Sequence, residues 1–356
     1  MAKKTTIIDV AREAGVSTAT VSRVLNNRES VGGENERLVR AAVEKLGYRP
    51  QAFARAVRSG KSGQIGLIIP QLGLENFVQL MDGVLMEAAK KGYSVVTMSS
   101  ESSSRMEMER IRDMAALPIE GLICRPVSSY EVLEQARDLL GIPVVGLFSA
   151  PEKPDAVPCA IENRENSAYQ GLRYLLSIGR RRIACVIPFR ETKISSMEQL
   201  EQMVRDGVNE IGVYRYRGYR RALEEAGMPI DPSLFLFYGY TEQEGRRAAE
   251  HLLGAGLCAD ALMAANDVAA LGAMSVFREQ GIHVPQQISV IGSDNSSICR
   301  AMTPTLTSID YHCVETGRYA MQMMEALLKD EALPLVPAEM HAELVIRRST
   351  CSPERE

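Results

Sequence analysis

The chain has 356 residues, of which 46% are hydrophobic and 24% are charged, and its formal net charge at pH 7 is −4. This composition is typical of a globular protein with two or three domains, and no apolar run approaches the ~20 residues of a membrane helix. Charged residues interrupt the N-terminus, so it lacks the apolar segment of a secretory signal. The seven cysteines are irregularly spaced without a C-x-x-C pair, which argues against a disulfide framework or a zinc site. We therefore expect a cytoplasmic protein with no membrane segment, no metal and no cofactor.

Charge is distributed unevenly along the chain. Residues 1–61 contain 12 Lys and Arg against 6 Asp and Glu, whereas the remaining residues contain 29 against 39. The N-terminal part is therefore basic and the rest is acidic. This asymmetry suits a protein whose N-terminal domain contacts the phosphates of nucleic acid while its body does not.

Residues 5–27 have the pattern of two short helices joined by a tight turn. Thr6 can cap the first helix, with Asp9 as the reciprocal acceptor of a capping box. Gly15 stands where the left-handed residue after a helix is needed, and Ser17 can cap the second helix. The apolar residues at helical spacing are Ile7, Val10, Ala11 and Ala14 in the first helix and Val21, Val24 and Leu25 in the second.

This layout is that of a helix-turn-helix, in which the second helix lies in the major groove of DNA. The polar face of that helix carries Thr18, Ala19 and Arg23, which we expect to read base edges. Arg23 suits a guanine, and Ala19 is limited to a contact with a thymine methyl group. Phosphate contacts are expected from Ser17, Thr20, Ser22 and Asn26. A bare pattern of this kind also fits a helical hairpin on the surface of an enzyme.

The same segment carries a more specific signature, DVA-x-x-AGVS-x-x-TVSRVLN, in residues 9–26. This signature resembles the LacI-type family of bacterial transcriptional regulators. The resemblance continues along the body of the chain in IGLIIP, GYRRALEEAGM, AANDVAALGAM, VPQQISVIGSDN and TPTLTSID. Over roughly residues 5 to 348 it implies a DNA-binding head, a hinge and an effector-binding core.

A third helix is expected over residues 31–47. Its apolar stripe comprises Leu38, Ala41, Ala42 and Leu46. The resemblance implies that the next segment, QAFARAVR at residues 51–58, is a hinge helix that pushes a side chain into the minor groove. Val57 stands where the family usually has Leu, and Arg55 is placed to meet phosphate. The expected domains are residues 1–50 for DNA binding, 51–62 for the hinge helix and linker, and 63–350 for the core.

From residue 64 onward, apolar runs alternate with helical periodicity. Strands are expected at 65–70, 93–98, 119–124, 143–148, 183–187, 234–238, 261–264 and 288–292, and helices at 75–91, 105–116, 129–140, 165–178, 217–227, 242–255 and 267–280. Apolar strands separated by helices form parallel sheets that are covered on both faces. We therefore predict two doubly wound parallel-sheet lobes with a boundary near residue 160, and a chain that crosses back near 293–325. The resemblance implies the fold of periplasmic sugar-binding proteins.

Ligands of open α/β sheets bind at the carboxyl ends of strands, so polar residues that follow the apolar runs are candidates. Asp294 can accept two hydroxyl donors of a sugar, although it can also cap the turn that follows. Asn266 is favoured over Asp267, because we expect Asp267 to cap the next helix. The resemblance adds Phe77 as an apolar wall and Arg215 as a fork for carboxylate, phosphate or hydroxyl groups. Without the resemblance, Arg215 would be read as a solvated residue on a helix surface.

One departure from the family pattern lies at residues 189–214, where the chain is longer than is usual. SSMEQLEQMV within this insertion predicts an added short helix. The insertion also loosens the register on which the assignment of Arg215 depends.

We predict a sequence-specific DNA-binding transcriptional regulator, with a repressor favoured, that binds a near-palindromic operator as a homodimer. A small-molecule effector in the cleft between the lobes, by default a sugar or sugar derivative, controls its affinity for DNA. The alternative is a soluble sugar-binding protein of a transport system, which would have no use for residues 5–58. An enzyme is not expected, because the G-x-G-x-x-A match at residues 254–259 follows a helix instead of a strand and the four histidines are dispersed.

Overall fold

The computed structural model of the chain describes residues 5–25, 33–48, 62–127, 129–148, 157–161, 163–189, 194–208, 210–256, 258–335 and 341–353. The chain divides into two compact units, Met1–Gly63 and Gln64–Glu356. The expected hinge residues 51–61 lie outside the described residues. Within the described residues, no helix has the length and apolar character required to cross a bilayer.

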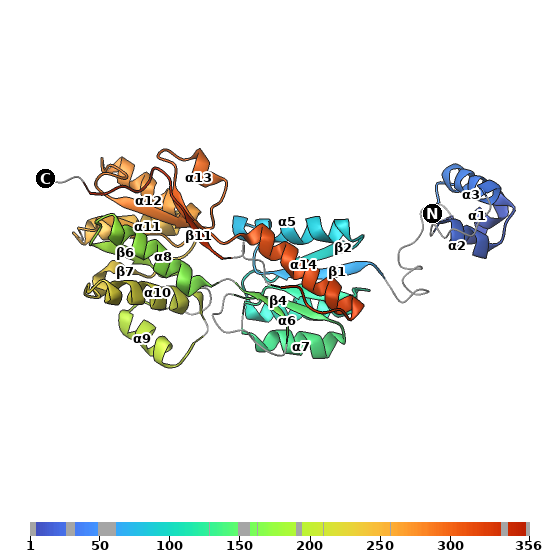
Figure 1. Cartoon of the computed structure of the whole chain (residues 1–356), viewed down its shortest axis with the longest axis horizontal. Coiled ribbons are helices and arrows are strands. Elements are labelled where there is room, and N and C mark those ends of the chain that lie inside the picture. The colour runs from blue at the N-terminus through green and yellow to red at the C-terminus, as the bar shows by residue number, and fades with distance from the viewer. Residues whose placement is uncertain are drawn as a thin grey trace. The chain divides into compact units, whose positions relative to one another are not determined.

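The N-terminal unit contains three helices, α1 (Ile7–Ala14), α2 (Thr18–Leu25) and α3 (Gly33–Lys45) (Figure 1). Helix α1 begins with the expected capping box, in which Thr6 Oγ1 accepts from the Asp9 amide and the Asp9 carboxylate accepts from the Thr6 amide. Gly15 ends α1 in the left-handed conformation, with φ of 65°, which glycine adopts without the clash of a Cβ. The turn between α1 and α2 is therefore set by local sequence.

The core of this unit is a small cluster of valines and alanines shared by the three helices. Val10, Val21 and Val39, one from each helix, are fully buried at its centre. The expected stripe of α3 is partly wrong, because Leu38 is 38% exposed. The next residue, Val39, is the one buried against α1 and α2, so the buried face of α3 is shifted by one residue from the expected stripe.

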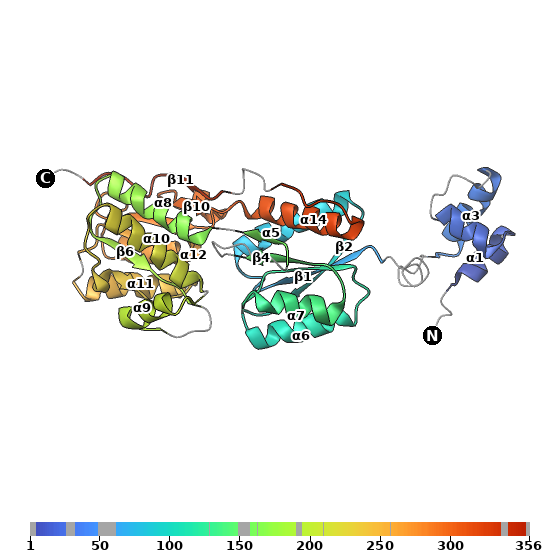
Figure 2. The same ribbon diagram turned by 60° about the horizontal axis from the view of Figure 1, so that its bottom comes forward.

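The first lobe of the second unit is a five-stranded parallel sheet in the order β2-β1-β3-β4-β5. The strands are β1 (Gln64–Ile69), β2 (Ser94–Ser99), β3 (Gly121–Cys124), β4 (Val144–Phe148) and β5 (Cys159–Ile161). Helices α5 (Glu75–Lys90) and α14 (Cys313–Lys329) cover one face, and α6 (Ser104–Ala115) and α7 (Glu131–Leu140) cover the other (Figure 2). Both faces of the strands are apolar for that reason.

The second lobe has six strands in the order β11-β10-β9-β8-β6-β7, parallel except for the antiparallel edge strand β11. The strands are β6 (Ile183–Val186), β7 (Phe235–Leu236), β8 (Ala261–Met263), β9 (Ser289–Ser293), β10 (Thr307–Asp310) and β11 (Glu343–Val345). The helices are α8 (Arg164–Ser177), α9 (Met197–Arg205), α10 (Ile211–Glu225), α11 (Glu242–Gly254), α12 (Asp267–Glu279) and α13 (Ile298–Ala301), with a 3-10 turn at Pro232–Leu234. Alternate strand residues pack on opposite layers: Ile183 and Cys185 on the α8 and α10 side, and Ala184 and Val186 on the α11 and α12 side.

The chain passes between the lobes three times. It leaves the first lobe after β5 and returns between β10 and α14. It then enters the second lobe again before β11. Helix α14 lies along α5 although more than 200 residues separate them in the chain (Figure 1). The predicted fold class, a helix-turn-helix head followed by two doubly wound lobes, is confirmed. The elements that were not expected are α13, α14, β5, β10 and β11.

Candidate functional site

Helix α2 has one buried face and one exposed face. Ser17 caps it, with its Oγ accepting from the Thr20 amide at 3.1 Å. Val21 and Val24 face the core, whereas Thr18 and Ala19 are exposed. The helix is therefore held by its apolar side and leaves its small polar side free for a partner.

Arg23 is exposed on the same side of α2. The ion pairs in the described part of this unit are Arg12–Asp9, Arg40–Glu36 and Lys45–Glu13. Arg23 is in none of them, so its guanidinium is available to an external acceptor. Thr20 and Ser22 are half-buried, at the edge of the exposed face. The other residues expected at DNA, Asn26, Arg55 and Val57, lie outside the described residues.

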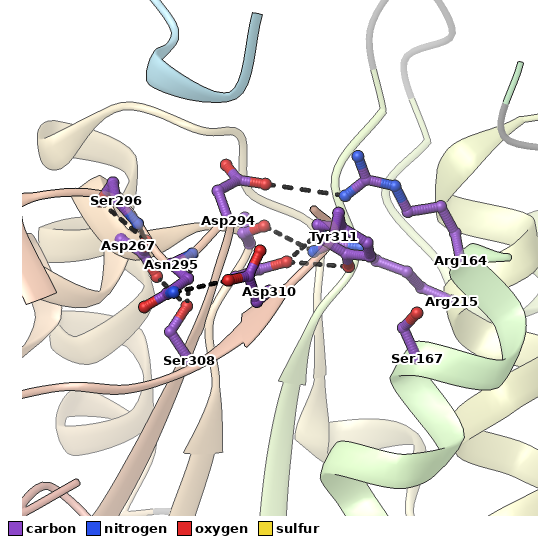
Figure 3. A network of polar contacts seen from close by, with 12 residues as sticks. Arg164, Ser167, Arg215, Asp267, Asp294, Asn295, Ser296, Ser308, Asp310 and Tyr311 are labelled. Atoms are coloured by element: carbon purple, nitrogen blue, oxygen red, sulfur yellow. Dashed lines mark hydrogen bonds and ion pairs between the residues drawn. The ribbon is translucent and has the colours of Figure 1, made fainter. Parts of the chain in front are cut away.

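In the second unit, the polar residues that follow β9 and β10 form a network (Figure 3). Asp294 follows β9 with φ of 105°, which is rare for a residue with a side chain. Its amide donates to the carbonyl of Ile309 at 2.8 Å, and its carboxylate lies 3.7 Å from Arg164. Strained backbone of this kind is concentrated at functional sites. The geometry is consistent with the position expected for Asp294 at a strand end.

Arg215 is buried inside this network, with 3% of its surface exposed. Its guanidinium donates to the carbonyl oxygen of Ala265 at 2.6 Å and to Ser293 Oγ at 3.2 Å. Ser293 in turn donates to the hydroxyl of Tyr311 at 2.9 Å. Helix α10 begins six residues before the expected helix, and so includes Arg215. The alternative that Arg215 is a solvated residue on a helix surface is wrong, because the turn of α10 that contains Arg215 packs inward against the sheet.

Arg164 was not among the expected site residues. It is 3% exposed, and its guanidinium stacks 3.4 Å from the centroid of the Tyr311 ring (Figure 3). A signal for it existed in the sequence, since Arg164 is the first residue of α8, where the helix dipole disfavours a cation.

Asn266, and not Asp267, caps the helix that follows them. Asn266 is the N-cap of α12, because its Oδ1 accepts from the Ala269 amide at 2.8 Å. Asp267 instead accepts from the Ser296 amide at 2.7 Å, from Ser296 Oγ at 2.8 Å and from Ser308 Oγ at 2.6 Å. The expectation that Asp267 caps the helix is therefore wrong. Burial raises the pKa of Asp267, although its serine partners act in the opposite direction.

The first turn of α5 brings residues of the first lobe to the second. Phe77 is 2% exposed and packs with Leu80 in the apolar cluster that continues into the second lobe. Glu75, in the same turn, accepts from the Ser297 amide at 2.7 Å and from Ser297 Oγ at 3.3 Å. The two lobes therefore contact each other directly beside the loop that carries Asp294.

The expected helix in the 189–214 insertion is present as α9. Ser196 caps it by accepting from the Gln199 amide, and Leu200 is fully buried. Glu201 accepts a hydrogen bond from the Tyr216 hydroxyl, so α9 is attached to α10 through a polar as well as an apolar contact. Residues 190–193 of the insertion lie outside the described residues.

Comparison with known families gives two matches. Residues 6–51 match the family described as bacterial regulatory proteins, lacI family. Residues 172–350 match the family described as periplasmic binding protein-like domain.

Curated relatives are similar along nearly the whole chain. The HTH-type transcriptional repressor PurR of Vibrio atlanticus (strain LGP32) is 30% identical over 342 residues, which cover 96% of this chain and 97% of the relative. Catabolite control protein A of Priestia megaterium is 29% identical over 345 residues, or 97% of this chain and 99% of the relative.

Solved structures share the fold. A lac repressor dimer bound to operator and the anti-inducer ONPF has a TM-score of 0.84 at 24% identity, covering 98% of this chain and 100% of that chain. The transcriptional regulator CelR in complex with cellobiose has a TM-score of 0.66 at 24% identity, covering 97% and 100%.

Proposed function

The chain belongs to the LacI family of bacterial regulatory proteins, and on that premise we propose that it is a homodimeric repressor whose operator affinity is set by a small molecule held between its lobes. The predicted function of a DNA-binding transcriptional regulator is confirmed, because the relatives that match over the whole length are named regulators. The alternative, a binding protein of a transport system, is not supported, since the family match includes residues 6–51. These relatives are regulators and not enzymes.

The observation that carries the DNA-binding part of the proposal is the orientation of α2. Its valines are held in the core, and Thr18, Ala19 and Arg23 are exposed together. These three side chains read base edges in the major groove, and Ser17, Thr20, Ser22 and Asn26 contact phosphates. In the proposed hinge, Arg55 contacts phosphate and Val57 enters the minor groove.

The effector site is proposed at the ends of β8, β9 and β10, with Arg215, Asn266 and Asp294 as ligand-binding residues and Phe77 as the apolar wall. Asn266 keeps its amide nitrogen for a ligand, because the helix cap uses its oxygen. A ligand that contacts both lobes favours one arrangement of the three connecting segments over another. The ligand therefore has different affinities for the two arrangements, and this difference changes the affinity of the protein for its operator.

A dimer surface is proposed on the second lobe. A groove of about 550 Å³ lies between the C-terminal half of α12, α13 and the turn at 281–284, and its apolar lining includes Leu271, Met274 and Met302. A near-palindromic operator requires a dimer with two-fold symmetry, and we assign this groove to the second copy because its lining is apolar. Leu271→Glu is expected to convert the dimer to a monomer in sedimentation velocity, and an unchanged dimer would reject this surface.

The experiment that tests the function is selection of DNA from a random pool by the purified full-length protein. A consensus with two-fold symmetry is expected. Arg23→Ala should then cost ~1–3 kcal/mol on the consensus and relax the preference at one position of each half-site. Arg105→Ala, an exposed arginine on α6, is the matched control. An equal loss of affinity on every DNA sequence would show that Arg23 contacts only phosphate. The absence of any consensus would refute the proposal.

A further inference from the structure

We propose that the effector is an anion, and that the guanidinium groups of Arg164 and Arg215 together bind its phosphate or carboxylate group. The inference rests on the proposed function, because it names the chemical class of the ligand for the same site. It is drawn from the charge balance of the network in Figure 3.

Arg215 carries a buried charge that its contacts do not neutralise. Only 3% of its surface is exposed, and its two acceptors, the Ala265 carbonyl and Ser293 Oγ, are both neutral. Across the described parts of the chain, no acidic side chain lies within ion-pair distance of Arg215. Burial of a charge without a counter-ion is costly, so an anion that enters the site recovers this free energy.

A second guanidinium increases the positive charge of the site. The positive charge of Arg164 acts on Arg215, so the two guanidinium groups lie close together. Arg164 forms an ion pair with the carboxylate of Asp294 at 3.7 Å. Arg164 and Arg215 are each only 3% exposed, so two buried guanidinium groups lie in this part of the network.

The other carboxylates of the network, Asp267 and Asp310, accept hydrogen bonds from neutral groups of the second lobe. Asp267 accepts from Ser296 and Ser308. Asp310 accepts from the side-chain amide of Asn295 at 2.7 Å and from the His312 amide at 2.8 Å. These bonds fix the loops after β9 and β10. They also direct both carboxylates toward neutral donors instead of toward the arginines.

Two further features favour an oxyanion at this place. Tyr240 is one of the tyrosines whose hydroxyl groups act electrostatically on Arg215, and its buried hydroxyl has no hydrogen-bond partner among the described residues. In addition, Arg164 is the first residue of α8, and the N-terminal end of a helix dipole stabilises an anion held close to it. The hydroxyl groups of a neutral sugar accept hydrogen bonds but leave the positive charge in place.

The test compares matched ligands on the full-length protein by isothermal titration calorimetry. The probes are glucose, glucose 6-phosphate, glucuronate and inorganic phosphate, so that a phosphate group and a carboxylate group are tested by different ligands. We expect at least one anionic probe to bind tenfold or more tightly than glucose. Arg215→Gln and Arg164→Gln should each weaken that probe about 10- to 100-fold, because each removes a charge-assisted contact.

Two variants separate a role in binding from a role in folding. Arg215→Lys keeps the charge and should keep the preference for the anionic probe, with a reduced affinity. Arg105→Gln removes an exposed charge of the first lobe and should leave all affinities unchanged. The melting temperature of each ligand-free variant shows whether it is folded.

Equal or tighter binding of glucose, or an anion affinity that survives both glutamine variants, would overturn the inference. So would the failure of every anionic probe to bind. Selection of operator DNA is measured independently, both without ligand and with each probe. A protein that selects a symmetric consensus but prefers glucose therefore refutes the anionic effector alone, whereas a protein that selects no consensus refutes the proposed function.

Discussion

The contact between α8 and α10 depends on Gly218, and replacement of this glycine by alanine is predicted to destabilise the second lobe. A Cβ at this position would lie 2.1 Å from the carbonyl oxygen of Glu165 and 2.9 Å from the amide of Tyr169. Ordinary contact begins at 3.4 Å, so α10 would have to move away by about 1.3 Å. Both neighbouring atoms belong to the backbone, and rotation of a side chain cannot relieve the clash.

The expected loss of stability in Gly218→Ala is the difference between two opposing effects. Overpacking costs about 1–3 kcal/mol or more, and exchange of a helical glycine for alanine returns about 1 kcal/mol. Because the clash involves rigid backbone, we expect the upper end of the first range and a net loss of about 2 kcal/mol. In a domain of this size that lowers Tm by roughly 5 °C. Effector binding should also weaken, since α8 and α10 carry Arg164 and Arg215.

The assay is thermal unfolding of the full-length protein followed by far-UV circular dichroism. Gly254→Ala is the matched control, because Gly254 is the last residue of α11 and no atom lies within 4 Å of its missing Cβ. This control should melt at or slightly above the wild-type temperature. If Gly218→Ala melted as high as the control, the close contact between the helices would not have the role assigned to it.

Three further predictions concern a cap, an ion pair and a buried carboxylate. Thr6→Ala removes the capping box and should cost about 1 kcal/mol. The amides of α1 should then exchange hydrogen about fivefold faster, and unchanged exchange would contradict this role. Lys329 and then Lys91 lower the pKa of Glu325, so its contribution is present at neutral pH and is lost as pH falls through the lowered folded-state pKa. Glu325→Gln should therefore destabilise the protein at pH 7 by at most ~1 kcal/mol after solvent screening, seen as a slightly lower Tm. This effect should shrink as the pH is lowered through the folded-state pKa of Glu325. Asp267→Asn replaces one of two acceptor oxygens by a donor and should cost about 2–3 kcal/mol, which an unchanged denaturant midpoint would disprove.

Much of the N-terminal unit was predictable from sequence because its structure depends on local contacts. Thr6 and Asp9 are three residues apart, and Gly15 needs only its own backbone freedom to end α1. The alternation of strands and helices was predictable for the same reason, since buried parallel strands and amphipathic helices differ in period. The stripe of α3 shows the limit of this reasoning. Leu38 and Val39 are equally apolar, and only the position of α1 and α2 decides which one is buried.

The site was less predictable, because its residues are brought together from distant parts of the chain. Asp294 was expected at the end of an apolar run, but the sequence contains nothing that places it beside Arg164, more than 100 residues earlier. Asn266 and Asp267 are both good helix caps, and their roles are distinguished by Ser296, in the loop after β9, and by Ser308, in β10.

What the sequence determined by itself is therefore the set of elements and the kind of protein, through short-range periodicity, caps and one N-terminal motif. What only the tertiary structure decided is the return of α14 to the first lobe and the burial of Arg164 and Arg215 in one network. Helical periodicity shows that a segment has an apolar face, but not which sheet this face will cover. Whether the charge of a buried arginine is neutralised likewise depends on which carboxylates the folded chain brings within a few ångströms, and that is a property of long-range packing.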